Sequence, residues 1–510
     1  MENKLKNKIL TLSELVKKRH ILKQEGKKVV QSHGVFDLVH PGIIKHLNQA
    51  RSQGEVLIVT VIKDKDVRRG PGRPIFPESF RAESVASLGQ VDFVCIVDDE
   101  TPFECLQVIK PDIFAKGQAY KERDRQIHQE IFTEEKEFSL GKEKLYETDG
   151  FHFSSTGFLN QFLNIYPDDT KAFLKEFAQQ YPFGVITEKL NELSALKVLV
   201  IGDGIIDEYH YCEPMGKAAK SNLVVNKYFA HEVFAGGTFA VANHVAGICG
   251  NIHLVSLLGS ADSREDFIRD SLKPNVTSRF FYREDGPTIV KKRYIHQYLN
   301  QKLFEVNFIN DTFVDDGLES QIIDYLKSII KSYDLVLLSD FGHGFISEKI
   351  YSVIEREAKI LAVNTQTNAA NAGYNLITKY HNPNFVCLDE PEIRLAAQSK
   401  YGNIDEIALK VREKINADFL IVTLGKRGSI GVDRAGNVNR TPIFSNKVVD
   451  TIGAGDAFFA YSAPCFARGM GLDLVSFVGN AVGALAVQIV GNKRPVEKHE
   501  LLELIHFLNK

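Results

Sequence analysis

The stretch VDTIGAGDAF, residues 449–458, places a β-branched apolar run, a glycine-rich turn and an aliphatic-aromatic run in direct succession. Glycine lets a backbone approach a ligand closely. A turn of this kind at a helix start aims several N–H groups at one point, which suits an anion. We therefore expect an anion hole at Gly453, Ala454 and Gly455. Asp456 would lie beside it, where a carboxylate can take a proton from a hydroxyl that attacks a phosphoryl group.

This stretch ends a long alternation of strand-like and helix-like segments. The alternation begins at residues 197–203, and further strand-like runs follow at residues 252–258, 335–339, 360–363 and 419–423. Such alternation is typical of βαβ units and a parallel sheet. The pattern predicts one large, doubly wound α/β domain over residues 196–510.

A second alternation occupies the N-terminal part of the chain. Residues 56–61 and 91–97 are typical of buried strands, and residues 42–52 and 80–88 of helices. We therefore expect a Rossmann-like α/β domain over residues 1–156. Between the two domains, residues 157–195 carry Phe158, Phe162, Phe173 and Phe177 at roughly helical spacing. This spacing predicts a helical connector packed on one of the domains.

Composition bounds the class of protein. The chain has 510 residues, 44% hydrophobic and 25% charged, which is typical of a soluble globular protein with several domains. The formal charge of −3 gives no general bias toward nucleic acid or an anionic membrane. Six scattered cysteines disfavour a zinc site or a disulfide framework. No apolar run is long enough to span a bilayer, so we expect a cytoplasmic enzyme without nucleic-acid or membrane partners.

The segment HGVFDLVHPG, residues 33–42, follows the first predicted strand and opens a helix. Imidazoles, a glycine turn and a helix N-terminus can together hold the phosphates of a nucleoside triphosphate. The segment resembles the HxGH signature of the nucleotidyltransferase superfamily, most closely its cytidylyltransferase-like domains. The resemblance implies that His40 is catalytic. It also implies a nucleotide-binding set of His33, Gly34, Phe36, Asp37, Gly42, Lys116, Ser154, Ser155 and Thr156. Residues 69–74 resemble the basic loop of that family, although a solvated turn has the same composition.

One position departs from this signature. Ile43 stands where the motif has its second histidine, and isoleucine can neither donate a hydrogen bond nor carry charge. His46 lies one helical turn further on, a spacing that does not guarantee the same reach. Two readings stay open. In the first, which we favour, His40, Lys116 and arginines are enough to support nucleotidyl transfer. In the second, transferase activity is weakened or lost.

The C-terminal segment resembles the ribokinase-like (PfkB) sugar kinases over residues 196–510. The resemblance implies that Asp456 is the catalytic base. It further implies sugar contacts from Asp207, Gly236, Gly237, Arg293 and Asp340, and ATP contacts from Thr423, Gly425, Gly428 and Asn480. Glu392 would hold Mg²⁺ through water, because Mg²⁺ prefers oxygen ligands. Lys291, Lys292 and Arg293 form a cationic strand in a region that meets the substrate's phosphate in the heptose kinases.

Two further positions depart from the kinase pattern. Ala240 replaces an asparagine, which removes a polar substrate contact, and Asp389 replaces the asparagine of an NxxE motif. The absence of a Walker A sequence disfavours the P-loop NTPases. These departures leave the identity of the sugar open.

Together the two parts resemble the bifunctional heptose-phosphate kinase/adenylyltransferases, the ADP-heptose synthase-like enzymes, with the domains in reversed order. This implies ATP-dependent phosphorylation of a sugar or sugar phosphate. It also implies nucleotidyl transfer from ATP or CTP to a sugar 1-phosphate, with Mg²⁺, in a homo-oligomer such as a dimer. One alternative is a sugar kinase with an inactive, nucleotide-sensing or assembly N-terminal domain. In a second alternative, the substrate is not a heptose but another polyol or sugar acid phosphate. The least favoured alternative is a non-enzymatic scaffold.

Overall fold

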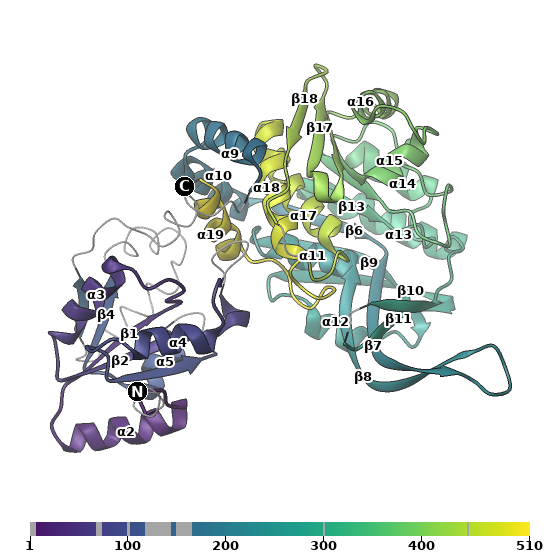
Figure 1. Cartoon of the computed structure of the whole chain (residues 1–510). Helices are drawn as coiled ribbons and strands as arrows, with labels where there is room; N and C mark the ends of the chain where they lie inside the picture. Colours follow the sequence, from purple (N-terminus) through teal and green to yellow (C-terminus); the bar gives the residue numbers. More distant parts are fainter. Residues whose placement is uncertain are drawn as a thin grey trace. The chain divides into compact units, whose positions relative to one another are not determined.

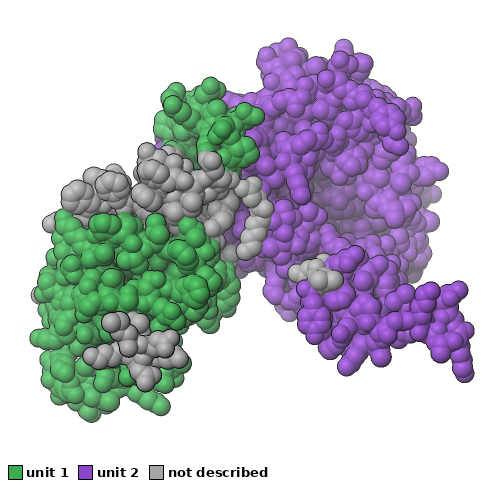
Figure 2. All heavy atoms as spheres, viewed as in Figure 1, with its two compact units in different colours: residues 1–183, 502–510 green, residues 184–501 purple. Residues whose placement is uncertain are grey.

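The computed structural model describes residues 7–67, 74–98, 102–117, 144–148, 166–298, 301–445 and 448–509. The chain forms two compact units, one of residues 1–183 with 502–510 and one of residues 184–501 (Figure 2). Both units are α/β structures with parallel sheets (Figure 1), which confirms the predicted fold class.

The first unit contains a five-stranded parallel sheet of strand order β3-β2-β1-β4-β5. The strands are β1 Val29–Gly34, β2 Val56–Ile62, β3 Phe93–Val97, β4 Ile113–Gly117 and β5 Lys144–Thr148. The helices are α2 Leu12–Gln24, α3 Pro41–Arg51, α4 Glu78–Ala86 and α5 Phe103–Ile109, with the short η1 Asp64–Asp66. Leu47 of α3 and Val85 of α4 belong to one core cluster, and Leu15 of α2 and Ile109 of α5 to another. These two clusters lie on opposite faces of the sheet, as the Rossmann-like prediction requires.

The same unit includes part of the predicted helical connector. Helix α9 spans Asp168–Gln180, and α10, Phe183–Glu192, begins where the second unit starts. The rings of Phe173 and Phe177 stack in α9 with centroids 5.8 Å apart, as their helical spacing predicts. Phe158 and Phe162 lie outside the described residues.

The second unit is built on a nine-stranded sheet of order β10-β9-β6-β13-β14-β15-β16-β17-β18. The strands are β6 Lys197–Gly202, β9 Asn251–Ala261, β10 Val276–Pro287, β13 Leu335–Asp340, β14 Leu361–Thr365, β15 Phe385–Asp389, β16 Phe419–Thr423, β17 Ser429–Asp433 and β18 Val438–Thr441. Pairing is parallel from β10 to β16 and antiparallel beyond it. The strands expected at residues 197–203, 252–258, 335–339, 360–363 and 419–423 are confirmed, with shifts of a few residues.

Helices cover both faces of this sheet. The helices are α11 Thr238–Ala246, α12 Glu265–Ser271, α13 Asp316–Ile329, α14 Glu348–Glu357, α15 Glu390–Ala396, α16 Ile404–Ile415, α17 Ala454–Ala467 and α18 Leu472–Ala486. Helix α19, Lys498–Leu508, begins in this unit, and its residues from 502 onward belong to the first. Ile322 of α13, Ile350 of α14 and Val411 of α16 share one large core cluster with the sheet. Helix α17 packs against both α11 and α18 (Figure 1). The unit is therefore doubly wound.

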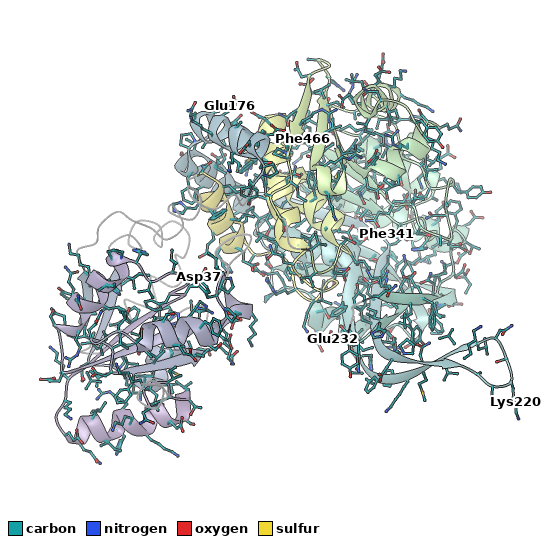
Figure 3. All side chains as sticks on the ribbon, viewed as in Figure 1. Asp37, Glu176, Lys220, Glu232, Phe341 and Phe466 are labelled. Carbon is teal, nitrogen blue, oxygen red and sulfur yellow. The ribbon has the colours of Figure 1, made fainter. Side chains whose placement is uncertain are left out.

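A separate four-stranded sheet, of order β12-β11-β7-β8, was not predicted. Its strands are β7 Gly204–Lys217, β8 Val224–Gly237, β11 Val290–His296 and β12 Lys302–Phe308. The ends of β7 and β8 extend as a long hairpin, and Lys220 lies near its tip (Figure 3). Because side chains alternate along a strand, Asp207, Lys291 and Arg293 share one face of this sheet.

Candidate active sites

The glycine turn of the larger unit lies at the start of a helix, as predicted. Gly453 is the N-cap of α17 with φ of 80°, a left-handed conformation that favours glycine. A Cβ at this position would lie 2.2 Å from Oδ1 of Asn492. Ala454, Gly455 and Asp456 form the first turn of α17, where backbone N–H groups have no partner inside the helix. Such a turn can hold an anion, although the role of these three residues stays a prediction.

Asp456 has the properties of a base that works near neutral pH. Its side chain is buried, and its Oδ1 accepts a hydrogen bond from Nε2 of Gln366. Burial, with the nearby charge of Asp207, raises the pKa of Asp456 to about 7, while the Gln366 bond and the charge of Lys291 act in the opposite direction. A carboxyl group with this pKa can accept a proton at physiological pH and release it again.

The predicted sugar-binding residues Asp207 and Arg293 lie together. Arg293 donates a hydrogen bond to Oδ1 of Asp207, and Nδ2 of Asn492 donates to Oδ2 at 3.2 Å. Arg293 also pairs with Glu305 at 2.7 Å. The guanidinium of Arg293 thus binds the carboxylates of both Asp207 and Glu305, and it orients Asp207 for a ligand. Gly237, which follows Gly236 at the end of β8, is the N-cap of α11.

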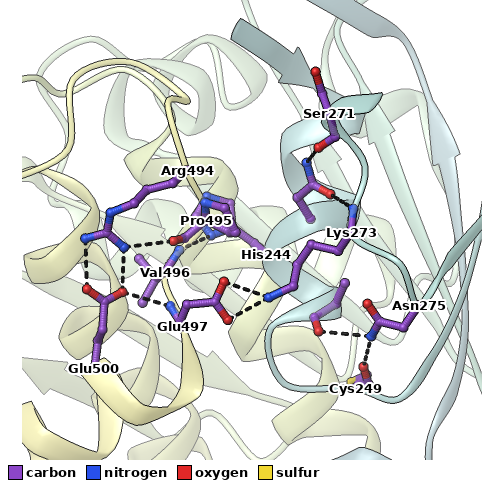
Figure 4. A network of polar contacts seen from close by, with 12 residues as sticks. His244, Cys249, Ser271, Lys273, Asn275, Arg494, Pro495, Val496, Glu497 and Glu500 are labelled. Atoms are coloured by element: carbon purple, nitrogen blue, oxygen red, sulfur yellow. Dashed lines mark hydrogen bonds and ion pairs between the residues drawn. The ribbon is translucent and has the colours of Figure 1, made fainter. Parts of the chain in front are cut away.

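The loop that carries Asn492 is fastened by a network of polar contacts (Figure 4). Arg494 donates to both carboxylate oxygens of Glu500 at 2.7 and 2.8 Å. Lys273 donates to Glu497 at 2.6 Å, and Nδ1 of the buried His244 accepts the backbone N–H of Val496 at 3.1 Å. Because Asn492 contacts both Asp207 and the Gly453 turn, this network positions two parts of the site at once.

Gly236 gives a direct test of the sugar site. A Cβ at this position would lie 2.1 Å from Oδ2 of Asp207, so Gly236→Ala must displace the carboxylate. We expect the KM for the sugar to rise by about tenfold or more in an ADP-release assay, because small misplacements of positioning groups are costly. Gly184→Ala is the matched control, since a Cβ there has no atom within 4 Å. An unchanged KM for Gly236→Ala would show that Asp207 does not contact the sugar.

Asp340 lies at the end of β13 and is fully engaged. Its Oδ1 accepts the N–H of Gly342 at 2.8 Å. Its Oδ2 accepts from the hydroxyl of Tyr380 at 2.5 Å and pairs with Lys379 at 2.6 Å. These contacts stabilise the loop that follows β13. A sugar contact by Asp340 stays a prediction, and these three partners favour a structural role for the side chain.

The predicted ATP-binding residues follow the end of β16. Thr423 ends that strand, and Gly425 and Gly428 lie in and after the turn η5, Gly425–Arg427. Asn480 of α18 donates to Oγ of Ser429 at 2.6 Å, next to Gly428 in sequence. The structure therefore brings this group of residues to one end of the sheet, where a nucleotide contact can be tested.

Glu392 occupies the third position of α15 in a capping box with Asp389. Its Oε2 accepts the N–H of Asp389 at 2.8 Å, and its Oε1 accepts the N–H of Thr367 at 3.0 Å. Burial and the neighbouring Asp389 raise the pKa of Glu392. The charge of Asp456 also raises the pKa of Glu392, so the two carboxyl groups lie within electrostatic reach of each other, and their oxygens suit Mg²⁺. Within the described ranges, no group of three or more His, Cys, Asp or Glu is arranged to hold a metal ion directly.

The candidate site of the first unit lies where its strand order reverses, between β1 and β4. Ligands of open parallel sheets bind at the carboxyl ends of the strands at such a point. His33 and Gly34 end β1, and Lys116 lies near the end of the adjacent β4. Nδ1 of His33 and the hydroxyl of Thr60 are hydrogen-bonded at 3.0 Å. The predicted residues on these two strands are thus brought to one edge of the sheet.

His40 is the N-cap of α3, two residues before Gly42. Its Nδ1 accepts the N–H of Gly42 at 3.2 Å, so the proton of the neutral ring lies on Nε2. Burial lowers the pKa of His40, which keeps the imidazole neutral near pH 7. The ring is therefore placed at a helix N-terminus as a hydrogen-bond donor, the arrangement that a phosphate requires.

The segment after β1 is fixed by Asp37, which Figure 3 labels. Its carboxylate accepts the N–H groups of Ile75 at 2.8 Å and Phe76 at 3.0 Å. Phe36 is buried beside Gly34 and adopts φ of 51°. These contacts hold residues 75–76 near the end of β1. Ser154, Ser155, Thr156 and most of the predicted basic loop lie outside the described residues.

The structure shows whether His46 can replace the second histidine of the motif, whose position Ile43 occupies. Ile43 packs against the apolar core of the first unit. The ring of His46 is held between the hydroxyls of Ser32 at 2.8 Å and Thr148 at 2.7 Å, and burial lowers its pKa to about 4. Both nitrogens of His46 are engaged, so this residue does not supply the missing second imidazole.

Arg81 is a buried residue of the first site that the sequence reasoning missed. It is 1% exposed and donates to the carbonyls of Phe76, Val35 and Ile62 and to Oδ1 of Asp64. Helix α4 also carries two glutamates and two serines, so its sequence did not single out Arg81 as a buried residue. In the second unit, Gln366 and Asn492 were also missed, because each acts on a residue far away in the sequence.

The second unit thus combines a doubly wound α/β fold with a glycine turn that is followed by a buried carboxyl group, Asp456. Comparison with known proteins gives its family. Residues 195–499, more than half of the chain, match the family model of the pfkB family carbohydrate kinases, and the chain belongs to that family. Residues 32–156 match the cytidylyltransferase-like model. The chain thus carries a transferase-type segment followed by a kinase segment, the predicted order along the chain.

Relatives of known name match only a part of the chain. The bifunctional protein HldE of a Nitratiruptor species is 44% identical over 105 residues, which is 20% of this chain and 23% of that protein. HldE of Campylobacter jejuni is 44% identical over 126 residues, which is 24% of this chain and 25% of that protein. The chain thus spans about a quarter of the length of these relatives.

Solved structures resemble the chain at the level of the fold. Phosphofructokinase-2 from Escherichia coli in complex with potassium has a TM-score of 0.51 at 16% identity, and the match covers 62% of this chain and 100% of that one. The tetrameric inhibited form of the same enzyme has a TM-score of 0.50 at 15% identity, with the same coverage. These identities establish a shared fold and nothing about the substrate.

Proposed function

We propose that the chain is a bifunctional enzyme of sugar-nucleotide synthesis. One site phosphorylates a heptose-like sugar or sugar phosphate with ATP, and the other transfers a nucleotidyl group from ATP or CTP to a sugar 1-phosphate. The observation that carries the kinase proposal is the buried Asp456 at the start of α17, with a pKa of about 7. The transferase proposal rests on the HldE relatives and on His33, His40 and Lys116 at the sheet edge.

In the kinase step, Asp456 takes the proton of the acceptor hydroxyl. The hydroxyl oxygen then attacks the γ-phosphorus of ATP, and the bond from that phosphorus to the ADP oxygen breaks. The N–H groups at Gly453, Ala454 and Gly455 stabilise the charge on the phosphoryl oxygens. Asp207 orients the sugar through its hydroxyls. Mg²⁺, held near Glu392 through water, would neutralise phosphate charge when bound.

In the transferase step, an oxygen of the sugar 1-phosphate attacks the α-phosphorus of the nucleotide, and pyrophosphate leaves. This reaction needs positioning and charge neutralisation more than proton transfer. His40 would donate a hydrogen bond to a phosphate oxygen, and Lys116 would supply positive charge. His33, Phe36 and Asp37 shape the loop around the nucleotide.

The wider organisation is also part of the proposal. Residues 1–156 would be the transferase domain, 157–195 a helical connector and 196–510 the kinase domain. Among the residues that the structure describes, no helix has the length and apolarity to cross a membrane. The cysteines within the described ranges are free and buried. We propose a cytoplasmic homo-oligomer, with dimers the first state to test by size-exclusion chromatography with light scattering.

A second candidate function is a sugar kinase whose N-terminal domain only senses nucleotide or supports assembly. Ile43 favours it, because this residue packs into the core and His46 does not replace the missing imidazole. Nucleotide binding without pyrophosphate release across a panel of sugar phosphates would support this alternative.

The kinase proposal predicts a specific pH dependence. We expect ADP release with hexose and heptose phosphates to rise with pH through about 7, because the raised pKa of Asp456 keeps the base protonated below that value. The screen with ATP and Mg²⁺ should identify an acceptor, and mass spectrometry should show its mass increased by one phosphoryl group. A rate that stays flat between pH 5 and pH 8 would contradict a base with this pKa, provided that chemistry limits the rate.

A further inference from the structure

A single carboxylate just before the glycine turn, that of Asp450, accepts hydrogen bonds from separate parts of the second unit. Its Oδ1 accepts from Nζ of Lys302 at 3.0 Å and from the N–H of Ile452 at 3.2 Å. Its Oδ2 accepts from the hydroxyl of Tyr209 at 2.7 Å and from the N–H of Gly491 at 3.0 Å. A carboxylate that binds donors from several segments fixes the position of those segments relative to one another.

Two of these donors come from the four-stranded sheet. Tyr209 on β7 lies opposite Arg293 on β11. Lys302, the first residue of β12, lies opposite Ile295 on β11. Because these two partners are two positions apart on β11, Tyr209 and Lys302 lie on one face of the sheet. The same face carries Asp207, the predicted sugar contact, which lies two positions before Tyr209 on β7.

The other two donors come from the glycine turn and from the loop packed against it. Ile452 directly precedes Gly453, the N-cap of α17, and Gly491 directly precedes Asn492. A Cβ at Gly453 would lie 2.2 Å from Oδ1 of Asn492, so the turn and the loop are in close contact. Asp450 therefore ties both of them to the four-stranded sheet.

The carboxylate of Asp450 is shielded from water and ionised. Its side chain is 9% exposed, whereas that of Lys302 is 40% exposed. Burial acts to raise the pKa of Asp450. The hydrogen bonds from Tyr209, Lys302 and Ile452 outweigh burial, so this pKa lies below its usual value. Because a buried carboxylate is costly unless it is paired, the ammonium of Lys302 stabilises the charge of Asp450 in this position.

We propose that Lys302, Tyr209 and Asp450 form a bridge that positions the glycine turn against the face of the four-stranded sheet that carries Asp207. In the proposed kinase, Asp207 holds the acceptor and Asp456, in the first turn of α17, takes the proton of its hydroxyl. These two groups belong to different elements, so the reaction needs a fixed distance between the sheet and the turn. The bridge rests on the proposed kinase function. Its three members act through other groups and are positioning residues.

The test measures ADP release by the intact chain with the acceptor that the screen identifies. We expect Lys302→Gln and Tyr209→Phe each to lower kcat/KM for the acceptor by about tenfold, because loss of either donor lets the turn shift against the sheet. Lys302→Arg should recover most of this loss, since a guanidinium also donates to a carboxylate. Lys349→Gln is the matched control. It removes a pair with the largely buried carboxylate of Glu319 at 2.7 Å, between α14 and α13, and should act like wild type.

Two further readouts separate positioning from a purely structural role. In Lys302→Gln, hydrogen–deuterium exchange should become faster at the N–H groups of Ile452 and Gly491, the two backbone donors to Asp450, and it should stay unchanged in Lys349→Gln. The rate of Lys302→Gln should still rise with pH through about 7 but reach a lower plateau, because the base Asp456 is retained.

Each result supports or contradicts the bridge. Wild-type kcat and KM in both Lys302→Gln and Tyr209→Phe would overturn it, and so would a loss of activity in Lys302→Gln that Lys302→Arg does not recover. A lowered Tm with unchanged exchange at Ile452 and Gly491 would show a structural role alone. A wild-type chain that phosphorylates no acceptor would contradict the proposed kinase, whereas the exchange measurement would still test the bridge.

Discussion

Asp456→Asn should lower the kcat for sugar phosphorylation by about 10²–10⁴-fold, the usual contribution of a positioned base. The substitution keeps the size of the side chain and can still contact Gln366, but the amide cannot accept the proton of the attacking hydroxyl. ADP release under saturating ATP and sugar measures the effect. The residual rate should also lose its dependence on pH near 7, because the group that titrates there is gone.

Stability separates this loss from misfolding. A carboxyl group whose pKa is raised in the folded state binds its proton more tightly than the unfolded chain does, so it stabilises at low pH and this contribution is lost as pH rises toward 7. At pH 8 the folded chain carries the cost of a buried charge that asparagine lacks. Asp456→Asn should therefore have an equal or higher Tm at pH 8, and full kinase activity in that variant would show that Asp456 is not the base.

His40→Ala should abolish pyrophosphate release and leave sugar phosphorylation unchanged. The imidazole is expected to donate from Nε2 to a phosphate oxygen, and loss of one preorganised donor of this kind costs about 10²–10³-fold in kcat. A pyrophosphate assay with ATP or CTP and a sugar 1-phosphate measures the effect.

His40→Asn is the matched variant for this experiment. Asparagine is a good N-cap, so it can keep the bond that His40 makes to the N–H of Gly42 and the start of α3 while removing the imidazole. We expect His40→Asn to lose the transferase reaction as fully as His40→Ala, with a smaller effect on Tm. Transfer at the wild-type rate in either variant would exclude His40 from the reaction.

The layered fold could be predicted from the sequence because its strands are buried on both faces. Continuous apolar runs, such as residues 198–201 and 419–422, then mark each strand directly. The four-stranded sheet could not be predicted from apolar runs. Its strands carry charged residues on both faces, for example Asp207 beside Glu208 on β7, so no clean alternation of apolar and polar residues marks them.

The site was predictable only in part, for a related reason. Asp456 and the glycine turn form one continuous motif, so their local geometry follows from neighbouring residues. The state of His46 depends on Thr148, which lies 102 positions away, and the orientation of Asp207 depends on Asn492 at a separation of 285. Lys291 and Arg293 look equivalent in sequence, and only the structure shows that Arg293 is paired while Lys291 is not.

The two-site account is tested most directly by following ADP and pyrophosphate side by side, in wild type, Asp456→Asn and His40→Ala. Each reaction contains nucleotide, Mg²⁺, the acceptor found by the screen and its sugar 1-phosphate. The account predicts that wild type forms both products, that Asp456→Asn forms only pyrophosphate and that His40→Ala forms only ADP. Loss of both products in either single variant, with the fold intact, would contradict two separate sites, and a wild-type chain that never releases pyrophosphate would leave only the kinase.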